Sequence, residues 1–227
     1  MFFKDAQPQN DGIAYGSTGY DKLDGIISDT KIFLGLSQVN DAGNDKLYGD
    51  SGNDEIFSGS GNDTLYGSSG NDFINSEQDN ELIEGGDDND TIFGAKGDDT
   101  VIGGKGNDSL EGNGDDDTLI GGKGKDNLTG GFGSDIFVFS PGDGAASRDE
   151  ADIITDFGTG FVGTGGADRI GLAGGLKADS IELETFGGGI FGIGERTALK
   201  ANGQYLAVLN SKFSKNDLNF LENFSIV

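Results

Sequence analysis

The chain has 227 residues, and its 40 acidic side chains outnumber its 15 lysines and arginines, so that its formal net charge is −25. It contains no cysteine and no histidine, which excludes disulfides, catalytic thiols, serine triads that use histidine and histidine-ligated metal sites. Because only 33% of the residues are hydrophobic, we expect the chain to repel itself and stay unfolded unless cations bind, and nucleic acid and anionic membranes are poor partners for it.

The amino-terminal part begins irregularly and then starts a repeat. Residues 1–15 are polar and predict a loosely held leader without the apolar core of a signal peptide. No apolar run of 18 residues occurs, so no membrane-spanning helix is expected. Residues 16–24 (GSTGYDKLD) form a complete nine-residue unit with Asp21 at its sixth position, residues 25–33 form a degenerate unit, and residues 34–39 break the register by six residues. We expect this break to be a loop in an early part of the same coil.

The segment 40–138 consists of eleven consecutive nonapeptides with the consensus GGxGxDxUx, in which U is a large apolar residue. Residues 103–111 (GGKGNDSLE) show the pattern. A period of nine matches neither a helix nor a hairpin. We therefore expect a coil in which GGxGxD makes a turn and xUx a short strand, so that each repeat is half a winding and alternate repeats lie in opposite sheets. The expected core consists of the eighth positions: Leu47, Ile56, Leu65, Ile74, Ile83, Ile92, Val101, Leu110, Leu119, Leu128 and Phe137.

This nonapeptide resembles the calcium-binding repeat of the RTX (repeats-in-toxin) family. The resemblance implies an all-β fold, namely a parallel β-roll, or right-handed β-helix of GGxGxDxUx repeats, with a β-rich C-terminal cap. It divides the chain into an N-terminal leader at 1–15, a calcium-binding β-roll at 16–138 that is degenerate near 25–39 and 76–84, and a capping and secretion-signal region at 139–227.

The sixth-position aspartates are the candidate metal ligands. Stacked at strand spacing along a turn edge, their carboxylates repel one another until divalent cations lie between them. Calcium suits such a site, because it accepts about six to eight oxygen ligands from carboxylates and carbonyls in flexible geometry. Roughly ten ions would nearly cancel the negative charge, so we expect folding and calcium binding to be one event. The candidates are Asp21, Asp45, Asp54, Asp63, Asp72, Asp90, Asp99, Asp108, Asp117, Asp126 and Asp135.

One repeat departs from the consensus. Residues 76–84 (SEQDNELIE) contain no glycine and place Glu81 at the sixth position. The other turns need glycine because they require positive φ angles and a close approach of backbone to backbone. We therefore expect a distorted turn at 76–84 and a weak or missing calcium ion there.

After Val138 the pattern changes. Residues 139–150 predict a turn followed by a loop, and Asp152 and Ile154 restore the sixth and eighth positions of a last, glycine-poor repeat. The passage 136–172 looks like the segment that closes the β-roll of secreted RTX proteins. That resemblance implies Asp152 as a terminal calcium ligand.

The remaining sequence predicts a β-rich cap, which a coil needs in order to cover its terminal winding. Short strands are expected at 169–172, 181–184, 190–193 and 205–209, separated by glycine turns, and a short helix capped by Ser214–Asp217 is expected to run through Phe220. The tail at 222–227 is similar to the uncleaved C-terminal signals of type I secretion substrates. The type I secretion apparatus is therefore an implied partner.

These features predict a secreted, extracellular calcium-binding protein that folds on its ions outside the cell and has a structural or interaction role rather than a catalytic one. Rows of equal carboxylates lack the separated, differently tuned acid pair of a glycosidase, and a chain without histidine has no HExxH zinc motif. A flexible acidic linker would not explain the periodic leucines and isoleucines. The alternative is an adhesion module whose flat sheet face binds a ligand, a surface or ice. Thr64, Thr100 and Thr118 project from one face in this arrangement, although Lys46 and Leu82 interrupt their row.

Overall fold

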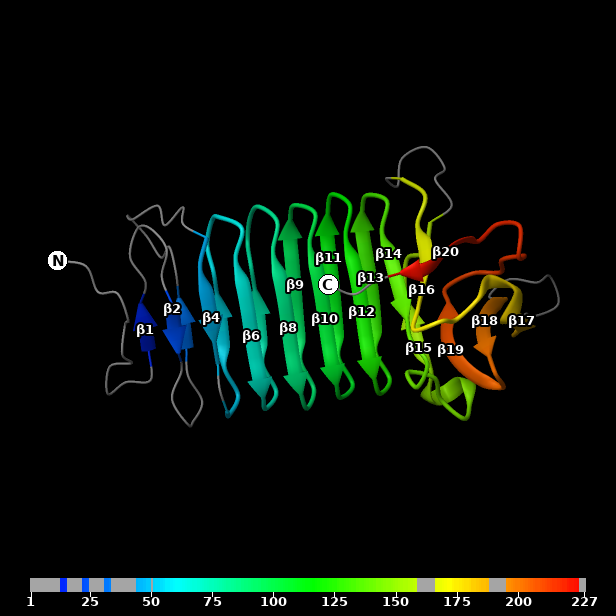
Figure 1. Ribbon diagram of the computed structural model, residues 1–227, viewed down its shortest axis with the longest axis horizontal. Coiled ribbons are helices and arrows are strands. Elements are labelled where there is room, and N and C mark those ends of the chain that lie inside the picture. Colours follow the sequence, from blue (N-terminus) through cyan, green and yellow to red (C-terminus); the bar gives the residue numbers. More distant parts are fainter. Residues whose placement is uncertain are drawn as a thin grey trace.

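The structure is a computed structural model, and it describes residues 13–15, 22–24, 31–33, 44–49, 51–158, 166–187 and 195–224. Within these ranges the chain forms two sheets whose strands are stacked along a solenoid, with a smaller antiparallel region near the C-terminal end (Figure 1). The helical pieces of the described ranges are two single turns, η1 (Arg148–Glu150) and η2 (Ala178–Ser180). No helix in the described part of the chain is long and apolar enough to cross a membrane. The predicted fold class, an all-β parallel β-roll, is confirmed.

All even-numbered strands except β18 form one sheet, sheet A, in which every pairing is parallel. From β2 to β16, consecutive members of this sheet are one full winding apart along the chain. In spatial order they are β2 (Lys22–Asp24), β4 (Lys46–Tyr48), β6 (Thr64–Ser69), β8 (Leu82–Asp87), β10 (Thr100–Lys105), β12 (Thr118–Lys123), β14 (Ile136–Phe139), β16 (Arg169–Ala173) and β20 (Asn219–Phe224).

The odd-numbered strands and β18 form sheet B, which ends in an antiparallel extension. The first eight of them continue the solenoid, and the last three are ordered against the direction of the chain. In spatial order they are β1 (Ile13–Tyr15), β3 (Lys31–Phe33), β5 (Glu55–Phe57), β7 (Phe73–Asn75), β9 (Thr91–Lys96), β11 (Ser109–Gly114), β13 (Asn127–Phe132), β15 (Asp152–Ile154), β19 (Gln204–Leu209), β18 (Arg196–Ala201) and β17 (Ile181–Phe186).

The strand register confirms that one nonapeptide is half a winding. Leu47 lies opposite Leu65, two repeats later in the chain. Between β2 and β4 the offset is larger, because Leu23 lies opposite Leu47. The coil thus absorbs the six extra residues at 34–39 without losing its pairing, although that segment itself lies outside the described residues.

The core is a double column of eighth-position side chains. All eleven of these side chains between residues 40 and 138 are fully buried. Ile154 in β15 and Ile170 in β16 continue the two columns, also at 0% exposure. Burial of one such side chain stabilises a fold by roughly 1.5–3 kcal/mol. The columns therefore supply the apolar core of the nonapeptide windings.

The second and fourth positions of the turns carry the positive φ angles. Gly86 and Gly104, at second positions, have φ values of 121° and 115°, and Gly106, at a fourth position, has 148°. Side chains with a Cβ resist this region, whereas glycine enters it freely. Ser68 and Ala95 nevertheless take φ values of 84° and 76° at second positions, so the coil tolerates some exceptions.

The repeat at 76–84 follows the same path as the other turns, so the expected distortion is wrong. Glu77 and Asp79 take positive φ values of 77° and 76° in place of glycines. Glu81 donates its N–H to Asp99 Oδ1 at 2.8 Å, as the consensus repeats do. Each non-glycine residue in this region costs roughly 1–3 kcal/mol, and the hydrogen bonds to both neighbouring windings offset that strain. The strand before this repeat, β7, is short and ends at Asn75, as β4 and β5 also end at the ninth positions of their repeats.

A ladder of fifth-position side chains, which the sequence analysis missed, also joins the windings. Asn71 donates its N–H to Asn53 Oδ1, and Asn89 donates its N–H to Asn71 Oδ1, each at 2.9 Å. The pattern continues at Asn107 and recurs on the opposite turn edge, where the Asn62 N–H donates to Asn44 Oδ1 at 3.0 Å. The available signal was the recurrence of Asn or Asp directly before the sixth-position acid in the repeats from Asp45 to Asp117.

Later parts of the chain cover the last winding of the roll. In sheet B, β19 pairs in parallel with β15, and β18 and β17 follow in antiparallel order. In sheet A, β20 pairs in parallel with β16. Neither sheet therefore ends on β15 or β16, whose edges would otherwise expose unpaired backbone groups.

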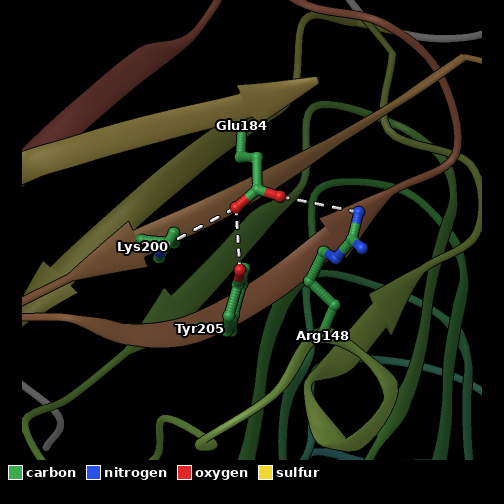
Figure 2. A network of polar contacts seen from close by, with 4 residues as sticks. All are labelled: Arg148, Glu184, Lys200 and Tyr205. Atoms are coloured by element: carbon green, nitrogen blue, oxygen red, sulfur yellow. Dashed lines mark hydrogen bonds and ion pairs between the residues drawn. The ribbon is translucent and has the colours of Figure 1, made fainter. Parts of the chain in front are cut away.

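Figure 2 shows polar contacts that join η1 to the strands of this region. Tyr205 Oη donates a hydrogen bond to Glu184 Oε2 at 2.7 Å. Lys200 Nζ lies 3.7 Å from the same oxygen, and Arg148 Nη1 lies 3.6 Å from Glu184 Oε1. The Arg148 guanidinium also stacks over the Phe186 ring, 4.2 Å from its centroid. The hydrogen bond from Tyr205, followed by the charges of Arg148 and Lys200, lowers the pKa of Glu184.

The predicted elements of this region are partly confirmed. The strands expected at 169–172, 181–184 and 205–209 are present as β16, β17 and β19, whereas β18 and β20 were not predicted. The strand expected at 190–193 lies outside the described residues.

The predicted short helix is wrong. Ser214 and Asp217 form a turn, in which the Ser214 N–H donates to Asp217 Oδ2 at 2.7 Å and the Asp217 N–H donates to Ser214 O at 3.0 Å. The chain then enters β20. The open edge of β16 offers a whole row of backbone partners, whereas an isolated helical turn is costly to nucleate.

Candidate metal centre

Two rows of buried acidic side chains run along the two turn edges of the roll. They arise because sixth positions 18 residues apart lie on successive windings. The side chains are between 0% and 7% exposed. The first row consists of Asp54, Asp72, Asp90, Asp108, Asp126 and Asp152, and the second row consists of Asp45, Asp63, Glu81, Asp99, Asp117, Asp135 and Asp168.

From Asp63 onward, one carboxylate oxygen of each row aspartate accepts a hydrogen bond from the backbone N–H of the preceding winding. In the first row, the Asp54 N–H donates to Asp72 Oδ1 at 2.8 Å, and the ladder ends where Asp126 donates to Asp152 Oδ1 at 2.9 Å. In the second row, the Asp135 N–H donates to Asp168 Oδ1 at 3.1 Å. The first row is thus a continuous hydrogen-bonded ladder. In the second row neither carboxylate oxygen of Glu81 accepts a hydrogen bond, so the ladder is interrupted at Glu81 and resumes with the Glu81 N–H and Asp99. The side chains of both rows are stacked along the solenoid, as the spacing predicted.

The other carboxylate oxygen is left without a hydrogen bond in much of both rows. Among the described residues, the Oδ2 atoms that are buried and accept no hydrogen bond belong to Asp72, Asp90, Asp99, Asp108, Asp117, Asp126 and Asp152. A buried, unsatisfied charged acceptor costs more than the roughly 1–3 kcal/mol of a neutral group. A repeated set of such atoms indicates a cationic partner.

The first-position glycines leave room for that partner. These glycines do not have positive φ angles, so the requirement for glycine is one of space. At Gly94, a Cβ would lie 2.5 Å from Asp99 Oδ2 and 3.1 Å from Gly112 O. Both oxygens therefore border a single point. The carboxylate distance lies within the roughly 2.3–2.6 Å between calcium and its ligands, and the carbonyl oxygen lies somewhat farther away. We call such a space, bounded by a sixth-position carboxylate and the first-position carbonyl of the next winding, an oxygen cradle.

The same cradle recurs along both rows. The carboxylate oxygen lies within 2.5 Å of the Cβ point in each case, and the carbonyl oxygen lies 2.6 to 3.1 Å from it. Cradles with both oxygens occur at Gly49, Gly67, Gly85, Gly94, Gly103 and Gly112.

The donor set of the cradles fits calcium. No group of three or more carboxylates that could hold a metal converges anywhere in the described residues. A bound ion would therefore take carboxylate oxygens from the rows and complete its shell with turn carbonyls. Hard oxygen donors of this kind suit calcium, which tolerates irregular geometry, better than magnesium, which demands a tight octahedron.

Burial raises the pKa of the row carboxyls, and the charges of neighbouring acids add to this effect while backbone hydrogen bonds oppose it. Burial and then the charge of Asp99 raise the pKa of Glu81 to about 9. The pKa is about 6 for Asp72 and Asp126, about 7 for Asp99, Asp108 and Asp135, and about 8 for Asp90, Asp117 and Asp152.

The direction of these pKa shifts determines how pH acts on the calcium-free fold. A folded carboxyl with a raised pKa holds a proton that the unfolded chain has already released. The stability of the calcium-free fold is therefore highest at acidic pH and falls as the pH rises from the ordinary carboxyl pKa, near 3.8, through these folded values. A cation bound in these rows would compete with protons for the same oxygens.

Most predicted ligands lie where the spacing places them. Asp21 falls outside the described residues. Asp168 was not predicted as a ligand, yet it ends the second row in the way that Asp152 ends the first. The signal for it was the pattern Asp168, Ile170 and Leu172, which repeats the sixth and eighth positions without the glycines.

These features define a parallel β-roll of nonapeptide repeats with carboxylate rows at its turn edges. Residues 39–74, 76–110 and 111–144 match the family model described as RTX calcium-binding nonapeptide repeat (4 copies). The repeat region of this chain is therefore similar to the RTX calcium-binding repeat.

Comparison with solved structures gives a weaker similarity. The solution structure of the AlgE6R3 subunit from the Azotobacter vinelandii mannuronan C5-epimerase matches at 20% identity, and the match covers 91% of this chain and 80% of that chain. Its TM-score of 0.27 is too low to support an argument. No curated protein sequence matches the chain.

Proposed function

We propose that the protein folds by binding about ten calcium ions along the two turn edges of its β-roll, and that its role is structural rather than catalytic. The observation that carries the proposal is the repeated oxygen cradle, in which a buried carboxylate oxygen without a hydrogen bond faces a backbone carbonyl. A cation in each cradle would satisfy both oxygens and offset the net charge of −25.

The proposed ligands are the sixth-position carboxylates of both rows together with first-position carbonyl oxygens. Bound calcium would supply positive charge and link oxygens of successive windings. The hydrogen bonds from backbone N–H groups to the Oδ1 atoms position the carboxylates. The aspartates are Asp21, Asp45, Asp54, Asp63, Asp72, Asp90, Asp99, Asp108, Asp117, Asp126, Asp135 and Asp152, to which the structure adds Asp168.

The proposed place of folding is outside the cell. The metal-free chain repels itself, so its folding depends on calcium binding. Binding stabilises a fold appreciably only where the free calcium concentration exceeds the dissociation constant, which requires abundant calcium. The RTX repeat match supports this proposal. Export by a type I secretion apparatus is part of it and rests on the sequence of the tail at 222–227.

The proposed organisation is a leader at 1–15, a roll at 16–138 and a capping and secretion-signal region at 139–227. Support for the capping role comes from the pairing of β19 with β15 and of β20 with β16. The surface-binding alternative receives no support, because the outward row in register runs Lys46, Thr64, Leu82, Thr100 and Thr118, and the threonines do not form an uninterrupted array.

The test is a calcium titration of metal-free protein at pH 7.5, followed by far-ultraviolet circular dichroism and by native mass spectrometry. We expect β-sheet signal and bound calcium to rise together, with no comparable change in magnesium. The Asp90→Asn variant should bind fewer ions, whereas the control Glu150→Gln, at an exposed position, should bind the wild-type number. Equal structure in chelator and in calcium, or a mass without bound ions, would overturn the proposal.

A further inference from the structure

The two carboxylate rows differ in the residues that precede them. In the first row, the described first positions are all glycine from Gly49 to Gly121. In the second row, serine replaces glycine at Ser58 and Ser76, and glycine resumes at Gly94. Both serine side chains are fully buried, although they lie in turns. A buried hydroxyl needs a hydrogen-bond partner, and the partner identifies what the serine does.

Each serine hydroxyl binds the carbonyl that lines a cradle elsewhere. Ser58 Oγ donates to Ser76 O at 2.9 Å. Ser76 Oγ donates to Gly94 O. Both acceptors are the first-position carbonyl of the next winding, as Gly112 O is in the cradle at Gly94. The serine hydroxyl thus donates a hydrogen bond to this carbonyl oxygen. In a glycine cradle the corresponding carbonyl oxygen would coordinate a cation.

The serine side chain also occupies the space itself. At the glycine positions, a Cβ would fall within 2.5 Å of the sixth-position carboxylate oxygen, which is the place where an ion would lie. A serine puts a real Cβ and a hydroxyl there. An ion at the same point would collide with the side chain and lose one of its carbonyl ligands.

The carboxylate partner changes in the second of these repeats as well. Glu81 replaces aspartate, and its side chain is one methylene longer. Both of its carboxylate oxygens are buried and accept no hydrogen bond, so Ser76 satisfies the carbonyl oxygen of this turn and not its carboxylate. The Glu81 N–H still donates to Asp99 Oδ1 at 2.8 Å, and the Thr100 N–H donates to Glu81 O at 2.9 Å. The backbone therefore stays in register, and the departure from the glycine cradles is confined to side chains.

We propose that the second row is calcium-free at the turns of residues 58–63 and 76–81, where the hydroxyls of Ser58 and Ser76 take the places of two ions. The first row binds calcium in each glycine cradle, and the second row binds it from Gly94 onward. The two turn edges of one roll thus carry different numbers of ions. This inference rests on the proposed function, because it concerns the occupancy of the same calcium sites, and it removes Asp63 from the ligands proposed above.

The experiment restores the consensus in the full-length protein and counts ions. The variant Ser58→Gly, Ser76→Gly, Glu81→Asp should bind two calcium ions more than wild type in native mass spectrometry, with the count checked by atomic emission of dialysed protein. The control Ser60→Gly changes a third-position serine of the same repeat and should bind the wild-type number. A restored variant that binds only the wild-type number overturns the inference.

A second variant tests whether the Ser58 and Ser76 turns are calcium-free even if the restored protein does not fold. With Ser58→Ala and Ser76→Ala the cradles stay filled but the hydrogen bonds are lost, so we expect an unchanged ion count and a lower melting temperature. A loss of ions in this variant would show that the hydroxyls are ligands, and would overturn the inference. If wild type itself binds no calcium, the proposed function fails; if wild type binds calcium and these variants behave otherwise, only the inference fails.

Discussion

The substitution Gly85→Ala tests the oxygen cradle directly. Gly85 does not have a positive φ angle, so alanine meets no backbone strain there. Its Cβ would lie 2.8 Å from Gly103 O and closer still to Asp90 Oδ2. Accommodating the extra methyl group in this crowded space lowers the stability of the fold by about 1–3 kcal/mol. Loss of one ion costs about a further 2.7 kcal/mol when free calcium is 100 times the dissociation constant.

The matched control is Gly114→Ala. Gly114 also lacks a positive φ angle, and a Cβ there would meet only Ala95 O, at 3.5 Å. We expect Gly114→Ala to keep the wild-type ion count and a melting temperature equal to or slightly above that of wild type. In saturating calcium, Gly85→Ala should bind at least one ion fewer and melt roughly 8–20 °C lower, because 1 kcal/mol corresponds to about 2–4 °C in a chain of this size. Native mass spectrometry and calorimetry provide the readouts. Equal ion counts and equal melting temperatures for the two variants would refute the cradle.

Three further predictions concern protons, the core and the cap. Calcium-free protein should show more β-sheet circular dichroism at pH 5 than at pH 8, because the pKa values of Asp90 and Asp117 are raised to about 8 in the fold; a signal that grows with pH contradicts this sign. Leu110→Ala, at a fully buried position, should lower the free energy of unfolding in saturating calcium by about 2–5 kcal/mol in urea titrations, and a change below 1 kcal/mol would show that the column is not tightly packed. Tyr205→Phe removes the hydrogen bond to Glu184, so the pKa of Glu184 should rise toward its ordinary value in a carboxyl-carbon NMR titration, and an unmoved pKa would refute that contact.

Periodicity explains how much of the roll could be predicted. The nonapeptide has one apolar position and one aspartate and is repeated without gaps. Only one strand register then stacks equivalent positions, and in that register residues 18 apart lie on successive windings. The pairing of Leu47 with Leu65 and the ladder from Asp54 to Asp72 both follow from that arithmetic. The 18-residue spacing did not predict Asp168 as a member of the second row, because Asp135 and Asp168 are 33 residues apart in the chain.

The sequence by itself determined the coil, its two-sheet core and the chemistry of its rows, because each of these depends on local spacing repeated many times. The tertiary structure decided what spacing does not encode. It showed that residues 219–224 complete an open sheet edge instead of a helix, and that first-position glycines make room for oxygen pairs instead of providing positive φ angles. It also showed that Ser58 and Ser76 fill that room. These outcomes depend on contacts between windings, and a contact between windings is a property of the assembled coil.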